Sequence, residues 1–367
     1  MCADRSEDRP LETLFLPLSE GHLAWPASGA LFLRARAGAP LQVRAWPSSE
    51  PGLVFHQTFA PDAAALERLQ LRVLTDDLDT LTQRFPLILI LPPRQRDEAR
   101  ALLARALQLT ERGGRIVACM SNDEGARSGE ADLERIVGPL TTLTKNKCRV
   151  FWSAPLDGPH DAALAEEWLR LDAVRPIDGG RFVSRPGVFA WDRIDVASQL
   201  LAEHLPPDLA GRAADLGAGF GYLSVELLQR CARIAALDVY EAERRALDLA
   251  RRNLAALESR AAIRYCWHDV TAGLTDSYDV IVCNPPFHTH ARADRPDIGR
   301  RFIAVAAQSL RPGVRLWLVA NRHLPYENAL SENFASMRTV VQAHGYKIIE
   351  AVRARSNKSA SKAGAAR

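Results

Sequence analysis

The sequence predicts an α/β protein built from two tandem domains, each with a mostly parallel sheet. Three observations support this prediction. The 367 residues are about twice the usual length of one domain. Strand-like and helix-like segments alternate through the second half, a pattern typical of parallel sheets covered by helices. Apolar blocks of the first half also recur in the second half with the same flanking glycines and prolines.

Composition excludes several classes of protein. Apolar residues make up 47% and charged residues 25%, which excludes a fully disordered or fibrous chain. No uncharged apolar run approaches the ~18 residues of a membrane span, and the charged first ten residues do not resemble a secretory signal. The six cysteines form no Cys-x-x-Cys pair. We therefore expect a cytoplasmic protein without a metal site or a disulfide framework.

Charge is distributed unevenly along the chain. Residues 1–180 hold 21 Lys/Arg against 25 Asp/Glu, and residues 181–367 hold 26 against 19. This asymmetry favours a polyanionic partner for the second half, although solvated arginines would also explain it. Residues 353–367 hold five basic residues and no acid, and predict a disordered tail. The tail either adds salt-dependent RNA affinity or has no role.

The expected domain boundaries follow from composition. Residues 176–190 contain three glycines and two prolines, typical of a connection. We predict a first domain over 1–175, a linker over 176–194, a second domain over 195–352 and a basic tail over 353–367.

The second domain alternates strands and helices in a Rossmann-like order. A closing hairpin turns at His344-Gly345-Tyr346 and adds one antiparallel strand. The helix before the fifth strand stops at Arg311-Pro-Gly313. In chain order we expect strand 213–216, helix 221–230, strand 234–237, helix 242–256, strands 261–266 and 280–283, helix 298–310, strand 315–320, and hairpin strands 339–343 and 347–352.

An internal repeat predicts that the first domain is a diverged copy of the second. Residues 85–93 match residues 278–286 at an offset of 193, and both blocks end in Pro-Pro. Residues 113–122 match residues 312–321 at an offset of 199. Unrelated domains of this class also alternate strands and helices in this way, but the shared Pro-Pro favours duplication.

The copies differ where chemistry is expected. The first lacks any Gly-x-Gly-x-Gly, has Leu91 where the second has Asn284, and has Arg94 where the second has Phe287. We therefore predict that the first domain is a scaffold or RNA-positioning domain that binds no cofactor.

The strongest motif is a glycine-rich turn between a strand and a helix. It runs Asp215-Leu-Gly217-Ala-Gly219-Phe-Gly221. Glycines let the backbone turn tightly and approach a ligand. The Gly-x-Gly-x-x-Gly spacing that seats a pyrophosphate is absent. The motif suits S-adenosylmethionine, which has no phosphate, with Asp215 at its methionine end; an ordinary glycine-rich turn is the alternative.

Two further carboxylates follow predicted strands. Asp238 comes 23 residues after Asp215 and could accept hydrogen bonds from both ribose hydroxyls, or it could cap the next helix. Asp269 follows the third strand and could accept from the adenine amino group, or it could serve as a loop cap.

A rigid polar segment follows the fourth strand, at the sheet edge where α/β proteins bind ligands. It runs Asn284-Pro285-Pro-Phe287-His288. The Asn284 side chain and the Pro285 carbonyl are two acceptors that can hold an exocyclic amino group. Such bonds would aim the poorly nucleophilic nitrogen at a sulfonium methyl group. Phe287 offers a stacking face to a base.

These motifs together resemble class I S-adenosylmethionine-dependent methyltransferases that act on an amino nitrogen. Three longer segments, 185–200, 283–288 and 319–326, are similar to the bacterial ribosomal RNA (guanine-N2)-methyltransferases. Taken together, the resemblance favours the small subunit methyltransferase C family. That family has two tandem methyltransferase-like domains with seven-stranded sheets, the first without cofactor. The resemblance covers about residues 85–352.

The resemblance assigns roles residue by residue. Asn284, Pro285 and Phe287, with His288, would hold the guanine. The cofactor would bind Asp215, Gly217, Gly219, Gly221, Asp238 and Asp269. Asp195 and Gln199 would close over its methionine end, unless they are structural, and Arg322 would lie in the substrate lip.

The resemblance also implies a function and its rivals. Segment 186–201 looks more like the branch that modifies 16S RNA, and Arg322-His323 looks more like the branch that modifies 23S RNA. We favour 16S ribosomal RNA, or the ribosomal subunit that contains it, as the partner. We expect the protein to be a monomer. A protein glutamine is a second class of substrate, but tyrosine usually replaces Phe-His there. The third possible function is that of a non-catalytic RNA-binding protein, and the intact motif set argues against it.

Overall fold

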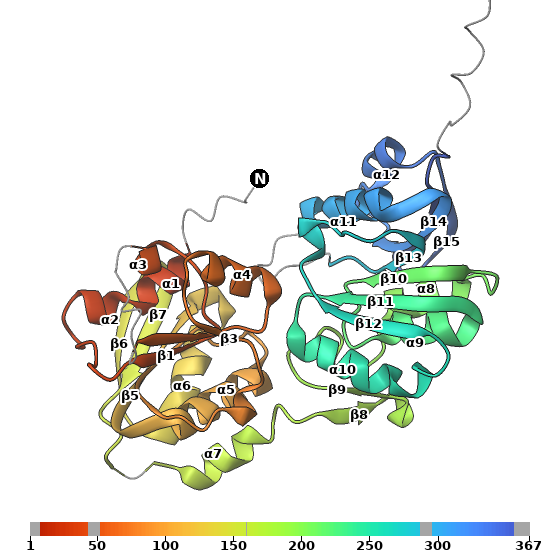
Figure 1. Cartoon of the computed structure of the whole chain (residues 1–367). Coiled ribbons are helices and arrows are strands. Elements are labelled where there is room, and N and C mark those ends of the chain that lie inside the picture. The colour runs from red at the N-terminus through yellow and green to blue at the C-terminus, as the bar shows by residue number, and fades with distance from the viewer. Residues whose placement is uncertain (1–7, 43–51, 159, 287–295, 356–367) are drawn as a thin grey trace, which may run out of the picture. The chain divides into compact units, whose positions relative to one another are not determined.

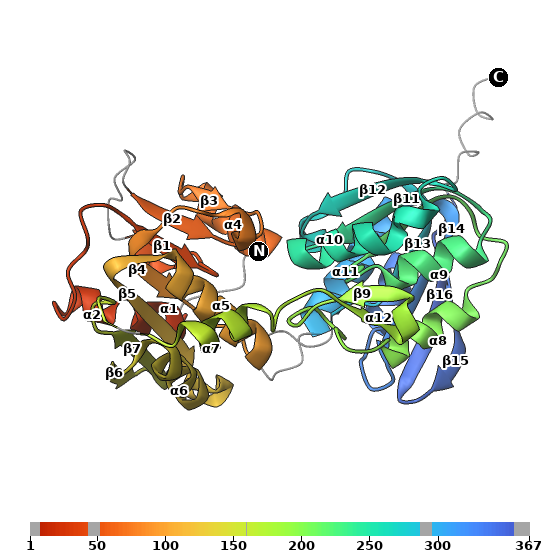
Figure 2. The ribbon, with the colours of Figure 1, turned by 90° about the horizontal axis from the view of Figure 1, so that it is seen from below.

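The computed structural model describes residues 8–42, 52–158, 160–286 and 296–355, which form two compact units (Figure 1). The first comprises the described parts of 1–175 together with 185–191. The second comprises 176–184 and the described residues from 192 onward. Each unit is a seven-stranded sheet with helices on both faces (Figures 1 and 2).

Both sheets have the same strand order and the same directions. Six strands run in one direction, and the hairpin strand next to the far edge, β7 or β16, runs antiparallel between its two neighbours. In the first unit the order is β3 (Val73–Leu74), β2 (Leu53–His56), β1 (Ala30–Leu33), β4 (Phe85–Ile90), β5 (Thr110–Ser121), β7 (Cys148–Ser153) and β6 (Leu140–Lys145). In the second it is β12 (Ala262–Trp267), β11 (Arg233–Glu241), β10 (Ala210–Leu216), β13 (Tyr278–Cys283), β14 (Leu310–Asn321), β16 (Tyr346–Val352) and β15 (Ser336–Ala343).

The matching sheets confirm the predicted fold class and the architecture that the repeat implied. The repeated blocks are β4 and β13, then β5 and β14, at equivalent places in the two sheets. We expected a closing hairpin only in the second domain, but β6 and β7 form one in the first as well. The turn between β15 and β16 holds His344 and Gly345, both with positive φ, because such two-residue turns fit the twist of the strands.

Helices bury the faces of both sheets. Continuous apolar runs such as Val280–Cys283 are buried on both sides of the sheet, as parallel strands require. The helices of the first unit are α1 (Arg9–Leu14), α2 (Leu16–Ser19), α3 (Ala39–Gln42), α4 (Ala60–Arg68), α5 (Arg96–Leu109), α6 (Ala126–Val137) and α7 (Ala162–Leu169). Those of the second are α8 (Val196–His204), α9 (Tyr222–Arg230), α10 (Arg244–Leu254), α11 (Pro296–Ser309) and α12 (Glu327–Asn333).

The segment predicted as a linker has structure of its own. At its start, β8 (Arg175–Ile177) pairs with β9 (Phe182–Ser184). The Asn253 side chain of α10 bonds both backbone groups of Val183, at 2.8 and 3.0 Å. Residues 185–191 instead belong to the first unit. A plain linker over 176–194 is therefore too simple, because this stretch contributes to both units.

Two other predictions can be placed only in part. Arg353 donates its backbone N–H to Val314, so the start of the predicted tail joins the second unit; the tail from residue 356 lies outside the described residues. Within the described part of the chain, no helix combines the length and apolar character needed to cross a membrane.

The close approach at Gly221 generates a stability prediction. Gly221 has φ +91°, and a Cβ there would lie 3.0 Å from the Ala250 Cβ on α10; Gly345 has φ +84° with open space around it. Gly345→Ala should cost about 1–2 kcal/mol of backbone strain. Gly221→Ala should cost roughly 1–3 kcal/mol more, because α10 must also shift. Urea denaturation of both variants measures this; equal losses would contradict the close-packing argument.

Candidate active site at the carboxyl edge of the second sheet

The glycine turn joins β10 to α9, as predicted. Gly217, Gly219 and Gly221 all have positive φ, between 57° and 91°, a conformation that glycine adopts without steric cost. The backbone N–H groups of Gly217 and Ala218 donate to the Tyr240 carbonyl at the end of β11, at 2.9 and 3.0 Å. The turn is therefore held against the neighbouring strand.

Asp215 lies beneath this turn and is fully buried. Its Oδ2 accepts a hydrogen bond from the Ser224 hydroxyl at 2.7 Å, while its Oδ1 has no partner. Burial raises the pKa of this carboxyl to about 7. A buried acceptor without a donor is costly in a folded protein. The arrangement fits a ligand that supplies a hydrogen-bond donor or a positive charge at this point.

Asp238 does not lie where the sequence suggested. It sits inside β11, three residues before the strand ends, and is 3% exposed. Its carboxylate accepts from Arg212 at 2.7 Å, from Arg264 at 2.7 and 3.1 Å, and from the Tyr278 hydroxyl at 2.7 Å. These groups on β10, β12 and β13 surround the carboxylate. The predicted ribose contact does not fit this position, and neither does a helix cap.

Glu241 occupies the place predicted for Asp238, and sequence reasoning missed it. It is the last residue of β11, beside the glycine turn. Its Oε2 accepts from the Gly219 N–H and its Oε1 from the Glu243 N–H, both at 2.8 Å. Burial raises the pKa of this carboxyl. The signal available was the apolar run Val239-Tyr240, which continues the strand beyond Asp238.

The segment after β13 lies at the same edge. Leu216 pairs with Cys283, so the glycine turn and Asn284 follow immediately from adjacent paired residues. The Asn284 Nδ2 donates to Asp195 Oδ2 at 3.0 Å and to the Ser198 hydroxyl at 2.8 Å. Phe287 and His288 lie outside the described residues. The structure thus brings Asp215, Glu241 and Asn284 to one sheet edge.

The other described residues of the predicted site make local contacts or lie at the surface. Asp269 caps a short helix after β12 by accepting from the Thr271 N–H and hydroxyl. Gln199 is exposed on α8 and donates to Glu203. Arg322 is exposed just after β14, at the carboxyl edge.

The first unit has different residues at the equivalent edge. Leu33 pairs with Ile90 as Leu216 pairs with Cys283, which places Arg34 at the position of Gly217. Arg34 has the same left-handed backbone, with φ +54°. Its guanidinium pairs with Glu98 at 3.2 Å. The turn of the first unit therefore carries an arginine side chain at the position where the second unit has Gly217, which has no side chain.

Two more positions show the same divergence. Gln57 stands where Glu241 stands, and its Oε1 likewise accepts from the N–H two residues on. Its amide nitrogen donates to the Ala35 carbonyl at 2.7 Å. Leu91, at the position of Asn284, is 5% exposed and packs in the core. Carboxylate and amide have both been replaced.

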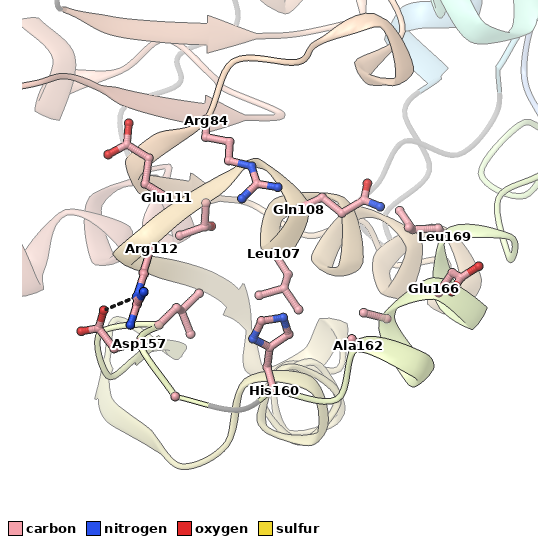
Figure 3. A pocket seen from close by; sticks show the side chains of 14 residues that line it. Arg84, Leu107, Gln108, Glu111, Arg112, Asp157, His160, Ala162, Glu166 and Leu169 are labelled. Carbon is pink, nitrogen blue, oxygen red and sulfur yellow. Dashed lines mark ion pairs between the residues drawn. The ribbon is translucent and has the colours of Figure 1, made fainter.

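The first unit also carries a hollow of about 610 Å³, shown in Figure 3. Arg84, which precedes β4, and Thr110, which begins β5, line it together with His160. Arg112 and Asp157 form an ion pair at its rim, 3.9 Å apart. It therefore lies at the amino-terminal edge of the first sheet, the opposite edge from the one that corresponds to the candidate site.

Known proteins resemble the chain in both sequence and fold. The family described as "Methyltransferase small domain" matches residues 179–350. Ribosomal RNA small subunit methyltransferase C of Salmonella choleraesuis is 30% identical over 268 residues, 72% of this chain and 75% of that protein. Ribosomal RNA large subunit methyltransferase G of Streptomyces avermitilis is 29% identical over 365 residues, 90% and 93% of the two chains.

One solved structure shares the fold over nearly the whole chain. It is a T. thermophilus 16S rRNA N2 methyltransferase in complex with AdoMet and guanosine, with a TM-score of 0.74 and 24% identity, covering 95% of this chain and 93% of that one. The sheet order and the glycine turn are those of a methyltransferase. More particularly, the chain belongs to the ribosomal RNA small subunit methyltransferase C family.

The position of Asp238 generates a prediction about stability. Asp238→Ala should leave two guanidinium groups and a phenol without their shared acceptor. Because Arg212 and Arg264 are 31% and 50% exposed, solvent screens part of the loss. We expect the free energy of unfolding to fall by roughly 2–4 kcal/mol. Asp269→Ala, which removes only a local cap, should cost about 1 kcal/mol. Urea denaturation compares the two; an unchanged midpoint for Asp238→Ala would contradict a structural role.

Proposed function

We propose that this protein transfers a methyl group from S-adenosylmethionine to the exocyclic N2 amino group of a guanine in 16S ribosomal RNA. The observation that carries the proposal is the pairing of β10 with β13, which puts Asn284 beside the glycine turn. Family membership supplies the class of reaction and of substrate.

The residues present fit the cofactor. The unpartnered Asp215 Oδ1 would accept from the methionine end, whose ammonium is cationic. The positive-φ glycines expose backbone to the ligand, and Glu241 would accept the ribose hydroxyls in place of Asp238. Asp269 remains the candidate for the adenine amino group. The cofactor supplies an electrophilic methyl group on a sulfonium.

The substrate amino group would be held by two acceptors. The Asn284 side-chain oxygen and the Pro285 carbonyl would each accept one of its N–H bonds. These bonds favour a pyramidal nitrogen and aim its lone pair at the methyl group, and alignment of this kind lowers the barrier to transfer. We also propose that Phe287 stacks on the guanine and that His288 and Arg322 contact the RNA.

The relatives bear on the choice of ribosomal subunit. The methyltransferase C proteins of Salmonella choleraesuis and Alteromonas mediterranea, 30% and 28% identical, are named for the small subunit. The large subunit methyltransferase G relative matches more of the chain, so methylation of 23S RNA is the second candidate. We also propose that the protein acts in the cytoplasm as a monomer.

Nucleoside mass spectrometry tests this function directly. In a deletion strain, N2-methylguanine should fall by one nucleotide per 16S RNA and remain unchanged in 23S RNA. The plasmid-borne wild type should restore it, and the Asn284→Ala variant should not. Loss from 23S RNA alone would favour the second candidate, and loss from neither would overturn the proposal.

Substitutions at the two ends of the site should separate chemistry from cofactor binding. Asn284→Ala should slow single-turnover methyl transfer by about 10²–10³-fold, since it removes one preorganised contact at the reacting centre. Its cofactor affinity should hardly change. Glu241→Gln should weaken cofactor binding by about tenfold, because it removes a charged acceptor. Calorimetry and rapid quench measure the two effects; near-normal transfer by Asn284→Ala would remove that residue from the mechanism.

The divergent first unit predicts how many cofactor molecules bind. Arg34, Gln57 and Leu91 replace the residues that would hold cofactor and base. Calorimetry of the full chain should therefore give one S-adenosylmethionine per chain. The Asp215→Asn variant should lose most of this signal, because its side chain brings an amide N–H₂ against a cationic group. A second site that survives this substitution would contradict a cofactor-free first unit.

A further inference from the structure

The amide of Asn284 is held from one side by the start of α8. Asp195 is the N-cap of that helix, and its Oδ2 accepts from the Ser198 N–H at 2.8 Å. The same oxygen accepts from Asn284 Nδ2 at 3.0 Å, and the Ser198 hydroxyl accepts from Nδ2 at 2.8 Å. One helix end thus engages the amide nitrogen of a residue 89 positions away.

The chemistry of these partners permits one orientation of the amide. An ionised carboxylate can only accept hydrogen bonds. If the Asn284 amide were flipped, its oxygen would face the Asp195 oxygen, and two acceptors would repel each other. The helix cap keeps Asp195 in place, because the Ser198 N–H at the first turn needs an acceptor. The side-chain oxygen of Asn284 is therefore the atom left to accept from a substrate.

The packing of α8 supports this arrangement. Ala197, Leu200 and Leu201 are buried on the helix, and Ser198 is 8% exposed. The helix contacts β14 and β16 of the same sheet. Asp195 and Ser198 are thus mounted on a packed element and not on a loop. The lid over the methionine end stays a prediction for Asp195 and Gln199; the Gln199 amide donates to Glu203.

We infer that Asp195 and Ser198 are positioning residues that orient the Asn284 amide so that its oxygen receives the guanine amino group. This inference rests on the proposed function. In this inference the start of α8 helps to orient the substrate nitrogen and does not bind the cofactor. Loss of either residue should lower the rate of transfer, with little change in the affinity for cofactor or RNA.

A double-mutant cycle with Asn284 tests the inference. Single-turnover transfer should fall roughly 10-fold in Ser198→Ala and roughly 100-fold in Asp195→Ala, since a misplaced reacting group costs rates of this order. Asp195→Asn keeps a carbonyl oxygen for both bonds and should stay within about fivefold of the wild type. In the Asn284→Ala background, each substitution should change the rate less than about twofold.

A matched control separates positioning from helix capping. Asp161 is the N-cap of α7 in the first unit and accepts from the Leu164 N–H at 2.9 Å. Asp161→Ala removes a similar cap far from Asn284 in the sequence and should leave the transfer rate unchanged. Ser198→Ala keeps the α8 cap, because only the hydroxyl is removed, so its loss of rate would not reflect a failure to fold.

The outcomes distinguish two failures. If the wild type transfers methyl groups and the losses are simply additive with Asn284→Ala, the positioning role is wrong while the proposed function stands. Weaker cofactor binding in Asp195→Ala, with a normal rate at saturating cofactor, would also overturn the role. If the wild type transfers no methyl group to ribosomal RNA, the proposed function fails and this inference fails with it.

Discussion

The parallel pairing of β10 with β13 is the constraint on which the candidate site depends. Leu216 lies opposite Cys283, so the glycine turn and Asn284 leave the sheet side by side. A slip of one residue would turn every side chain of a strand to the other face. The side chains of β13 are closely packed on both faces, so a slip would force all of them to repack. Core packing therefore sets the distance between the proposed cofactor turn and the proposed substrate acceptor.

The two units show how one topology serves different purposes. Their sheets share strand order and direction, yet Arg34 replaces Gly217 and Leu91 replaces Asn284. The sheet core tolerates these changes because they fall on the turns after the strands. A fold of this kind does not by itself imply a reaction. We propose that the chemistry belongs to the turns of the second unit, where the described residues include Gly217 and Asn284.

Three carboxylates of the second unit, Asp215, Asp238 and Glu241, differ in their hydrogen-bond partners. Asp238 is enclosed by two arginines and a tyrosine, which satisfy it within the protein. Asp215 keeps one buried oxygen without a partner, and Glu241 touches the backbone of the glycine turn. The difference in partners is the reason why we assign Asp238 to the stability of the sheet and propose Asp215 and Glu241 as cofactor ligands.

The sequence by itself determined the α/β class, the duplication, the glycine turn and the Asn284 segment, because each depends on local features such as alternation, apolar runs and glycines at positive φ. Tertiary structure decided which acid reaches the edge. The apolar run 234–237 predicts a strand that ends at Asp238, but Arg212 and Arg264 on neighbouring strands pair with that carboxylate, and β11 continues to Glu241. The contact of Asp195 with Asn284 was likewise invisible, because it joins residues distant in the chain. Partners brought together by folding, and not local pattern, decide what a polar side chain does.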